Sequence, residues 1–177
     1  MAKMNRYYRL TRVESDRFGV AYTPEDIGFE LVDEHVRGDK WNPVSFTLKD
    51  GGFSDYQIND NNWPMCSKKL KTLLETGASA EDSLEWLSVN VVDQSGTSEE
   101  YFVLHFPERP DVLDQKRTLF AGDFVVKPVF SRTLIGPHRV FSYPSGESVV
   151  IIAEPVKDAI TQANCVGLDF IEVPISG

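Results

Sequence analysis

The side chains best suited to chemistry in this chain are two cysteines and three histidines, spread along 177 residues. Cys66 directly precedes a predicted helix, whose N-terminus would stabilise a thiolate, and Lys68 and Lys69 follow it. This is the best nucleophile position in the chain, but no histidine is near it in sequence, and a small buried thiol explains it better. The histidines His35, His105 and His138 could act together only if folding brought them close.

Sequence motifs for common cofactors and metals are absent from the chain. It has no G-x-x-x-x-G-K-[ST] or G-x-G-x-x-G phosphate loop, no H-E-x-x-H, no paired C-x-x-C and no G-x-S-x-G elbow. Carboxylates are numerous, but no spacing singles out an acid–base pair. The sequence therefore predicts neither a cofactor nor a metal site.

A polar segment, "SDYQINDNNWPMCSKKLKTLLE" (54–75), places an Asn- and Asp-rich loop before an amphipathic helix. Its spacing does not match a calcium loop, because the required Gly and closing Glu are missing. One interpretation is an Asx-turn loop that leads into the helix. The other is an exposed contact surface anchored by an aromatic side chain. The predicted partner-binding residues are Asp55, Asp60, Asn61, Asn62 and Trp63.

Composition favours a globular protein that stays inside the cell. Hydrophobic residues make up 41% and charged residues 25% of the chain, and no apolar run approaches the roughly 18 residues of a membrane span. The N-terminus lacks the apolar region of a secretory signal. The net charge of −9 disfavours nucleic-acid binding and would attract a basic protein, although solubility alone also explains it. We therefore expect a cytoplasmic protein without membrane contact.

Hydrophobic periodicity predicts an α+β fold, with a mainly antiparallel sheet and two short amphipathic helices. Alternating residues predict one hairpin, in which Leu87, Val89 and Val91 share a core face with Phe102, Leu104 and Phe106, leaving His105 on the opposite face. Helices are predicted after Ser67, a good N-cap, and from Glu154, with Pro155 in the first turn. The other predicted strands are residues 6–13, 18–22, 27–32, 43–48, 123–130, 139–143, 148–152 and 168–173.

The two predicted helices align with each other without gaps. "SKKLKTLL" (67–74) matches "AEPVKDAI" (153–160), so that Lys71 corresponds to Lys157 and Leu74 to Ile160. Each helix is followed by a strand, which indicates either two strand–helix–strand units or the coincidence expected of amphipathic helices. We expect one domain over residues 1–177, with possible sub-units 1–100 and 101–177.

The C-terminal stretch "RVFSYPSGESVVIIAEPVKDAITQANCVGLDFIEV" resembles a bacterial immunity-protein family named after a Myxococcus immunity protein. The opening "YYRL" is similar to the family's first strand. Ala153 replaces the family's usual Ser at the helix entry, and Pro155 is unusual there. The matching residues are Phe141, Ile152, Val156, Lys157, Asp158, Ala159, Ile160, Gly167, Phe170 and Val173.

This resemblance implies an immunity protein that binds and neutralises a cognate protein toxin of a polymorphic toxin system. It brings no catalytic residues and no cofactor, so it implies a protein that is not an enzyme. The alternative is an enzyme or small-ligand-binding domain with a site between the two strand–helix–strand units. Cys66, His105 and His138 are then the first candidates. The oligomeric state and the contact residues do not follow from the sequence.

Overall fold

The computed structural model describes residues 6–24, 41–145 and 148–177, and it has the α+β fold that the sequence predicts. The predicted strand at 27–32 and His35 lie outside the described residues. The first elements in chain order are β1 Tyr7–Arg12, β2 Val20–Tyr22, β3 Val44–Lys49, β4 Tyr56–Asn59, β5 Met65–Ser67, α1 Lys68–Gly77 and β6 Glu85–Val92. The remaining elements are β7 Ser98–His105, β8 Leu119–Ala121, β9 Phe124–Lys127, β10 Phe130–Ser131, α2 Arg132–Ile135, β11 Val140–Phe141, β12 Ile151–Ala153, α3 Glu154–Gln162, β13 Leu168–Glu172 and β14 Ile175–Ser176.

Six strands close into a small barrel in the order β2-β3-β6-β7-β5-β4. The β2–β4 and β3–β6 pairs are parallel, and the other pairs are antiparallel. Alternate residues of these strands point inward and form a buried core. Its buried residues are Ala21, Phe46, Leu48, Trp63, Met65, Leu87, Val89, Val91, Tyr101 and Val103.

The antiparallel pairing of β6 with β7 is confirmed, but the predicted faces are wrong. Leu87 lies opposite Val103, so the barrel core contains Val103 and Tyr101 from β7. Leu104 and Phe106 belong to a different core outside the barrel, against the helices. A barrel strand that is also covered by a helix is buried on both sides, so alternation does not identify one inner face.

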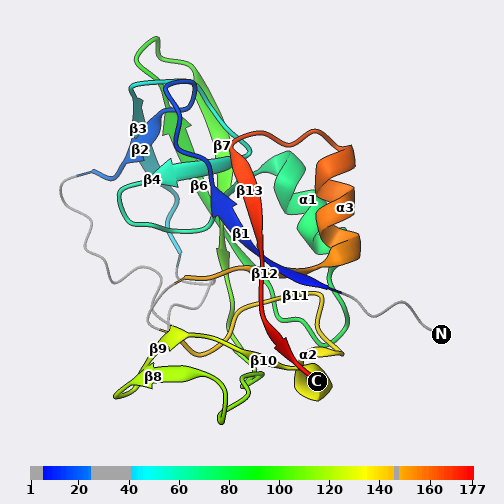
Figure 1. Ribbon diagram of the computed structural model, residues 1–177. Helices are drawn as coiled ribbons and strands as arrows, with labels where there is room; N and C mark the ends of the chain where they lie inside the picture. Colours follow the sequence, from blue (N-terminus) through cyan, green and yellow to red (C-terminus); the bar gives the residue numbers. More distant parts are fainter. Residues whose placement is uncertain (1–5, 25–40, 146–147) are drawn as a thin grey trace.

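A second sheet has four antiparallel strands in the order β11-β12-β1-β13. The first strand of the chain, β1, is therefore central in a sheet whose other strands come from the last 40 or so residues. Figure 1 shows β1 beside β13, with the helices α1 and α3 lying next to each other along one side of the molecule.

The barrel and the second sheet contain the same four-element unit. In the barrel, β7 lies between β5 and β6 and runs antiparallel to both, while α1 connects the outer two strands. In the second sheet, β1 lies between β12 and β13, which α3 connects. Phe102 pairs with Cys66 and Ser88, and the equivalent Tyr8 pairs with Ile152 and Glu172. The two strand–helix–strand units therefore share topology and register.

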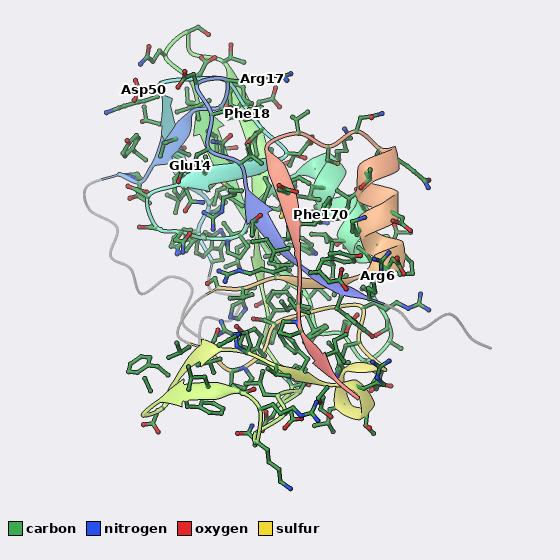
Figure 2. All side chains as sticks on the ribbon, in the orientation of Figure 1. Arg6, Glu14, Arg17, Phe18, Asp50 and Phe170 are labelled. Atoms are coloured by element: carbon green, nitrogen blue, oxygen red, sulfur yellow. The ribbon has the colours of Figure 1, made fainter. Side chains whose placement is uncertain are left out.

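Cation–π contacts repeat between the units at the aligned lysines. Lys71 Nζ lies 5.2 Å from the ring centroid of Phe102, and Lys157 Nζ lies 5.0 Å from that of Tyr8. Each lysine also covers one further ring, Trp86 or Phe170, on the equivalent third strand. Phe170 lies between β13 and the helices in Figure 2. The alignment of the two helices in sequence thus corresponds to an alignment in space.

The main core lies where α1 and α3 pack against each other and against both sheets. The helices are in close contact at Gly77, where an added Cβ atom would lie 2.7 Å from Val156 Cγ2. Ser67 is the N-cap of α1, as predicted, because its Oγ accepts a hydrogen bond from Leu70 N. The buried residues are Tyr8, Leu10, Tyr56, Cys66, Leu70, Leu74, Leu104, Phe106, Val140, Val150, Ile152, Val156 and Ile160.

A third, smaller layer joins the chain between β7 and β11 to the C-terminus. β10 pairs in parallel with β14, and the two-stranded ribbon β8–β9 packs Phe120 and Val125 on this layer. The prediction of a single strand at 123–130 is wrong, because Pro128 lies between two shorter strands, β9 and β10. The four-residue helix α2 was not predicted. Among the described helices, none combines the length and apolar character needed to cross a membrane.

Candidate functional site

The polar segment at 54–63 is part of the barrel, because β4 and β5 form a hairpin around residues 60–64. Asp55, at its start, is a structural link between the two units. Its carboxylate accepts hydrogen bonds from Ser67 Oγ at 2.6 Å and from Val166 N at 2.8 Å. Its backbone N–H donates to Val166 O, so the segment before β4 is held to the segment before β13.

The turn between β4 and β5 carries the other residues that we predicted to bind a partner. Asp60 is exposed and accepts hydrogen bonds from the backbone N–H and the hydroxyl of Thr23. Asn62 is exposed, with φ of 57°, and its carbonyl accepts a bond from Arg12. Asn61 Nδ2 is buried without a hydrogen-bond partner among the described residues. Partner binding by these residues stays a prediction.

Trp63 does not have the exposed position that we expected for an anchor. Its side chain is 3% exposed and packs edge-on against Phe46 and Trp41. Asn59 fixes the turn from inside, because its side chain accepts from Trp63 N and donates to Trp63 O. The apolar ring is buried because it closes the end of the barrel core, which the local polar sequence does not reveal.

Cys66 is a buried core residue without nucleophile character. Its thiol is fully enclosed in the core between the barrel and the helices, and this burial raises its pKa well above the ordinary value. Burial also raises the pKa of Cys165. The helix N-terminus that follows Cys66 therefore does not produce a thiolate, and the interpretation as a small buried thiol is the one that fits.

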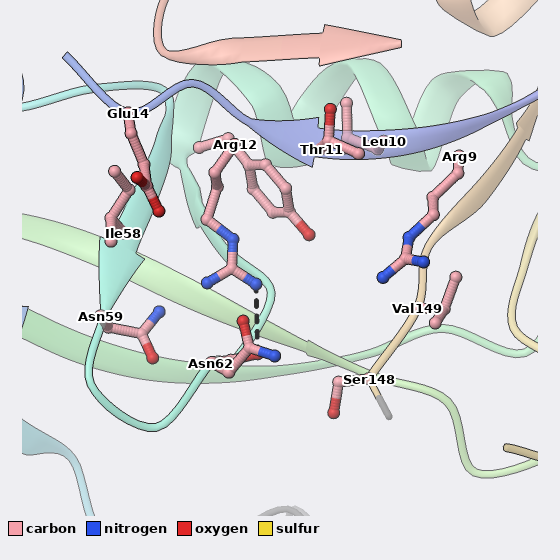
Figure 3. A pocket seen from close by; sticks show the side chains of 11 residues that line it. Arg9, Leu10, Thr11, Arg12, Glu14, Ile58, Asn59, Asn62, Ser148 and Val149 are labelled. Carbon is pink, nitrogen blue, oxygen red and sulfur yellow. Dashed lines mark hydrogen bonds between the residues drawn. The ribbon is translucent and has the colours of Figure 1, made fainter. Parts of the chain in front are cut away.

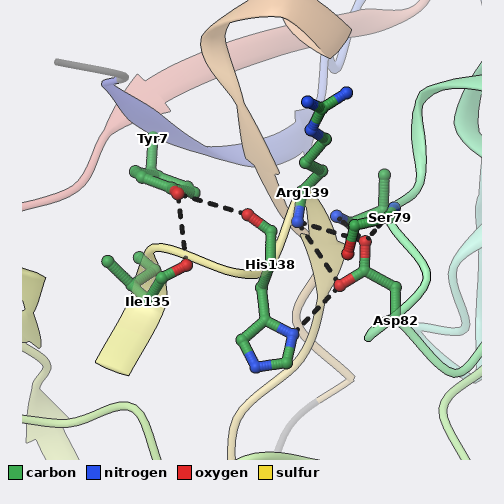
Figure 4. Close-up of polar contacts among 7 residues, drawn as sticks. Tyr7, Ser79, Asp82, Ile135, His138 and Arg139 are labelled. Carbon is green, nitrogen blue, oxygen red and sulfur yellow. Dashed lines mark hydrogen bonds and ion pairs between the residues drawn. The ribbon is translucent and has the colours of Figure 1, made fainter. Parts of the chain in front are cut away.

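Both described histidines are hydrogen-bonded to carboxylates that follow α1, one in the loop before β6 and one at the first residue of β6. His105 Nδ1 lies 2.8 Å from Glu85 Oε2, and its buried Nε2 has no partner among the described residues. His138 Nδ1 lies 3.1 Å from Asp82 Oδ1 (Figure 4). Neither histidine shares a bonded partner with Cys66 in the contacts of the described residues, so the three candidates form no constellation.

Asp82 is the centre of the polar contacts in Figure 4, and its bonds are structural. Its buried carboxylate accepts from the backbone N–H groups of Ser79, Arg139 and Val140 at 2.7, 3.1 and 2.9 Å. The bonds from Arg139 and Val140 join the segment after α1 to the start of strand β11. His138 also lines a pocket of about 310 Å³ together with Glu108 and Arg109. A carboxylate with three backbone donors orients the imidazole but is poorly placed to relay protons.

A second pocket, of about 340 Å³, lies beneath β1 and brings together two arginines (Figure 3). Arg12 lies over the Tyr56 ring, with 5.3 Å from its Cζ to the ring centroid, and donates to Asn62 O at 3.2 Å. Arg9 reaches the same space from the other end of the strand. We did not predict this pocket, because its lining comes from three segments far apart in sequence. The described residues contain no group of three or more His, Cys, Asp or Glu side chains suited to a metal ion.

The ribbon β8–β9 carries the most exposed of the large apolar side chains among the described residues. Phe124 is 70% exposed, Val126 57% and Leu119 56%. Figure 1 shows the ribbon projecting from the lower part of the molecule. We did not predict this surface, because the sequence predicts one strand over "DFVVKPVF", with Pro128 as a sign of an edge or a bulge, and no exposed ribbon. The sequence contains a signal for this surface. Apolar residues stand on both sides of the turn at Gly122 and Asp123, and there are more of them than one buried face of a hairpin would need.

Comparison with known families places the chain in context. Residues 19–174 match the model of the immunity protein family Imm11, and this match covers most of the chain. No curated protein matches the chain. The matched residues include all six barrel strands, both helices of the repeated units and the β8–β9 ribbon, and they leave out β1 and β14. The chain therefore belongs to the Imm11 immunity protein family.

Proposed function

We propose that this protein binds and neutralises a cognate protein toxin in the cytoplasm of a bacterium that carries a polymorphic toxin system. Membership of an immunity protein family is the observation that carries this proposal. Neutralisation by binding needs a stable surface and no bond-making groups. The buried Cys66 thiol and the carboxylate-bound histidines are consistent with such a protein, which would not be an enzyme.

The surface best suited to hold the toxin is the β8–β9 ribbon. Exposed aromatic and aliphatic side chains lose water-accessible area on binding, and such anchors dominate the free energy of most interfaces. Phe124, Val126 and Leu119 provide these anchors, while Phe120 and Val125 fix the ribbon to the core beneath it. A pre-formed ribbon loses little conformational entropy when a partner docks. The turn with Asp60, Asn61 and Asn62 remains a second proposed contact.

The charge of the protein supports capture of a basic partner. A net charge of −9 would accelerate association with a cationic toxin domain, and the association rate would fall as salt is added. It would also keep the protein away from nucleic acid. We expect this contribution in the association rate more than in the dissociation rate.

Co-expression with the product of the adjacent gene tests the proposal. We expect that product to stop growth alone, and we expect this protein to restore growth and to co-purify with it. The matched pair of variants is Phe124→Ser in the ribbon and Ile171→Ser on β13, because both replace an exposed apolar residue. Restored growth with Ile171→Ser but not with Phe124→Ser would support the ribbon. An adjacent product that is harmless, or one that this protein neither binds nor neutralises, would overturn the proposal.

A further inference from the structure

The two ends of the β8–β9 ribbon differ in chemistry. Its strand pairs run from Leu119 with Lys127, where the ribbon leaves the core, to Ala121 with Phe124 beside the turn. The end at the turn carries the 70% exposed Phe124. The end at the core carries Lys127 and, just before β8, Lys116, and both lysines are exposed. The ribbon therefore has an apolar tip and a basic base.

The two lysines at the base are available to a partner, because neither side chain has an ion pair or hydrogen bond among the described residues. The carboxylates nearest to them in sequence are bonded within their own turn. Asp114 accepts from the backbone N–H groups of Lys116 and Arg117 and lies 3.9 Å from Arg117 Nε. Asp111 accepts from the side-chain amide of Gln115. In a chain with a net charge of −9, the base thus presents positive charge.

The spacing between the basic base and the apolar tip is fixed before a partner arrives. The Thr118 hydroxyl joins the two strands at the base, because it donates to Val129 O and accepts from Val129 N, each at 3.1 Å. Phe120 and Val125 pack on the core beneath the ribbon. A partner therefore has to offer an apolar surface and a negative one in matching places, and little ordering of the ribbon is needed.

Asp123 restricts the shape of that partner surface. It is exposed in the turn, directly after Gly122, which has φ of 60°. Enclosing this carboxylate without a hydrogen-bond partner would be costly. The surface that receives the ribbon is therefore open to water at the turn, so the ribbon lies across a groove and does not enter a closed pocket.

We propose that the toxin surface that receives the ribbon is a groove with an apolar floor and with acidic side chains along the edge that meets Lys116 and Lys127. This inference rests on the proposed function, because it names the chemistry of the toxin's contact surface. The net charge of −9 attracts a cationic toxin as a whole, whereas the two lysines act on groups within the Debye length of about 8 Å. A toxin that is basic overall, with a local acidic edge on its groove, satisfies both.

An anionic membrane also combines negative charge with an apolar interior, but the observations favour a protein groove. The net charge of −9 opposes approach to an anionic membrane. Two lysines are also fewer than the roughly four to eight of basic clusters that bind such membranes.

The affinity of charge-reversed variants for the purified product of the adjacent gene tests the proposal. Lys127→Glu and Lys116→Glu should each weaken the complex about tenfold, and Lys127→Arg should stay within about twofold of the intact protein. Lys68→Glu is the matched control, because it makes the same change of net charge at an exposed lysine on α1. It should weaken binding by less than about twofold.

The outcomes separate this inference from the proposed function. Equal affinity of Lys127→Glu, Lys116→Glu and Lys68→Glu, with weaker binding of Phe124→Ser, would overturn the acidic edge and leave toxin binding by the ribbon in place. Absence of any complex with the intact protein would contradict the proposed function itself. Binding of the intact protein, but not of Phe124→Ser, to vesicles of phosphatidylglycerol and phosphatidylethanolamine would assign the ribbon to a membrane and overturn the inference.

Discussion

Helices α1 and α3 occupy equivalent places in their two units, yet different groups hold their first turns. Ser67 caps α1 with its Oγ and donates in turn to Asp55. At the same position α3 has Ala153, without a side-chain cap, and Pro155 follows. Glu154, in the first turn of α3, accepts two bonds from Arg6 at 3.1 and 2.6 Å, which raise the pKa of that arginine. The two equivalent helix starts therefore use different chemistry, a side-chain cap at α1 and an ion pair with Arg6 at α3.

The two units also differ in their sheets, because the sheet of the first unit is closed and that of the second is open. Strands β2, β3 and β4 complete the first unit as a barrel, whereas the second unit gains only β11 and leaves β13 as an edge. The middle strand of each unit comes from the other half of the chain, since β1 belongs to the first half and β7 to the second. The two halves thus exchange their central strands, which ties the units together more firmly than the helix contact alone.

The largest effect that we predict comes from cutting the chain in the β6–β7 turn. Fragments 1–95 and 96–177 would each lose the central strand of their sheet, so neither should fold alone. Mixed in equal amounts, they should regain the dispersed amide spectrum of the intact protein. A dispersed spectrum from either fragment alone would show that the possible sub-units 1–100 and 101–177 are independent, and the exchange account would be wrong.

Asp82→Ala should give the next largest effect, because it removes the link between the segment after α1 and strand β11. Three backbone N–H groups and His138 would lose their acceptor. We expect the free energy of unfolding to fall by about 3–5 kcal/mol, measured by urea denaturation. Asp158→Ala, at an exposed carboxylate on α3, is the control and should change it by less than about 0.5 kcal/mol. A loss below about 1 kcal/mol in Asp82→Ala would mean that water replaces the carboxylate.

The helix starts should respond unequally to reciprocal substitutions. Ser67→Ala should lower the free energy of unfolding by about 1–2 kcal/mol, because Leu70 N and Asp55 both lose a partner. Ala153→Ser should change it little, because the cost of burying a hydroxyl at the fully buried Ala153 would offset the cap bond that it gains, and Pro155 already removes one donor of the first turn. Thermal unfolding of both variants measures these changes. A larger loss of stability in Ala153→Ser than in Ser67→Ala would contradict the prediction.

The smallest predicted effect tests whether the repeated lysines are equivalent. Lys71→Met and Lys157→Met keep the apolar stem but remove the charge above a pair of aromatic rings. Each should cost about 0.5–1 kcal/mol of unfolding free energy. A difference above about 1 kcal/mol between the two would show that the units are similar in shape but not in energetics.

The sequence was enough to predict the repeated helices, because each has a long apolar stripe and a clear start. It was not enough to predict the barrel, whose strands β4 and β5 are only four and three residues long. Gln57 reads as polar and exposed, yet it is fully buried and donates to Gly19 O, a partner 38 residues away. Such pairing is invisible to periodicity, because a distant backbone group satisfies the polar side chain.

The candidate sites were less predictable than the fold. Burial of Cys66 follows from its place before an amphipathic helix, and we considered it from the start. The pocket of Arg9 and Arg12 depends on three segments that meet only in the folded chain. The exposure of Phe124 depends on Pro128, which ends β9 and lets the ribbon leave the core. Local patterns do not contain either long-range arrangement.

Direct binding of the purified toxin domain to the intact protein and to Phe124→Ser is the measurement that addresses the central claim. The account predicts a tight complex that weakens at least about thirtyfold in Phe124→Ser and is unchanged in Ile171→Ser, as expected for a buried aromatic anchor. Equal affinity of all three proteins would place the contact elsewhere and contradict the ribbon. Absence of any complex with the intact protein would contradict neutralisation by binding.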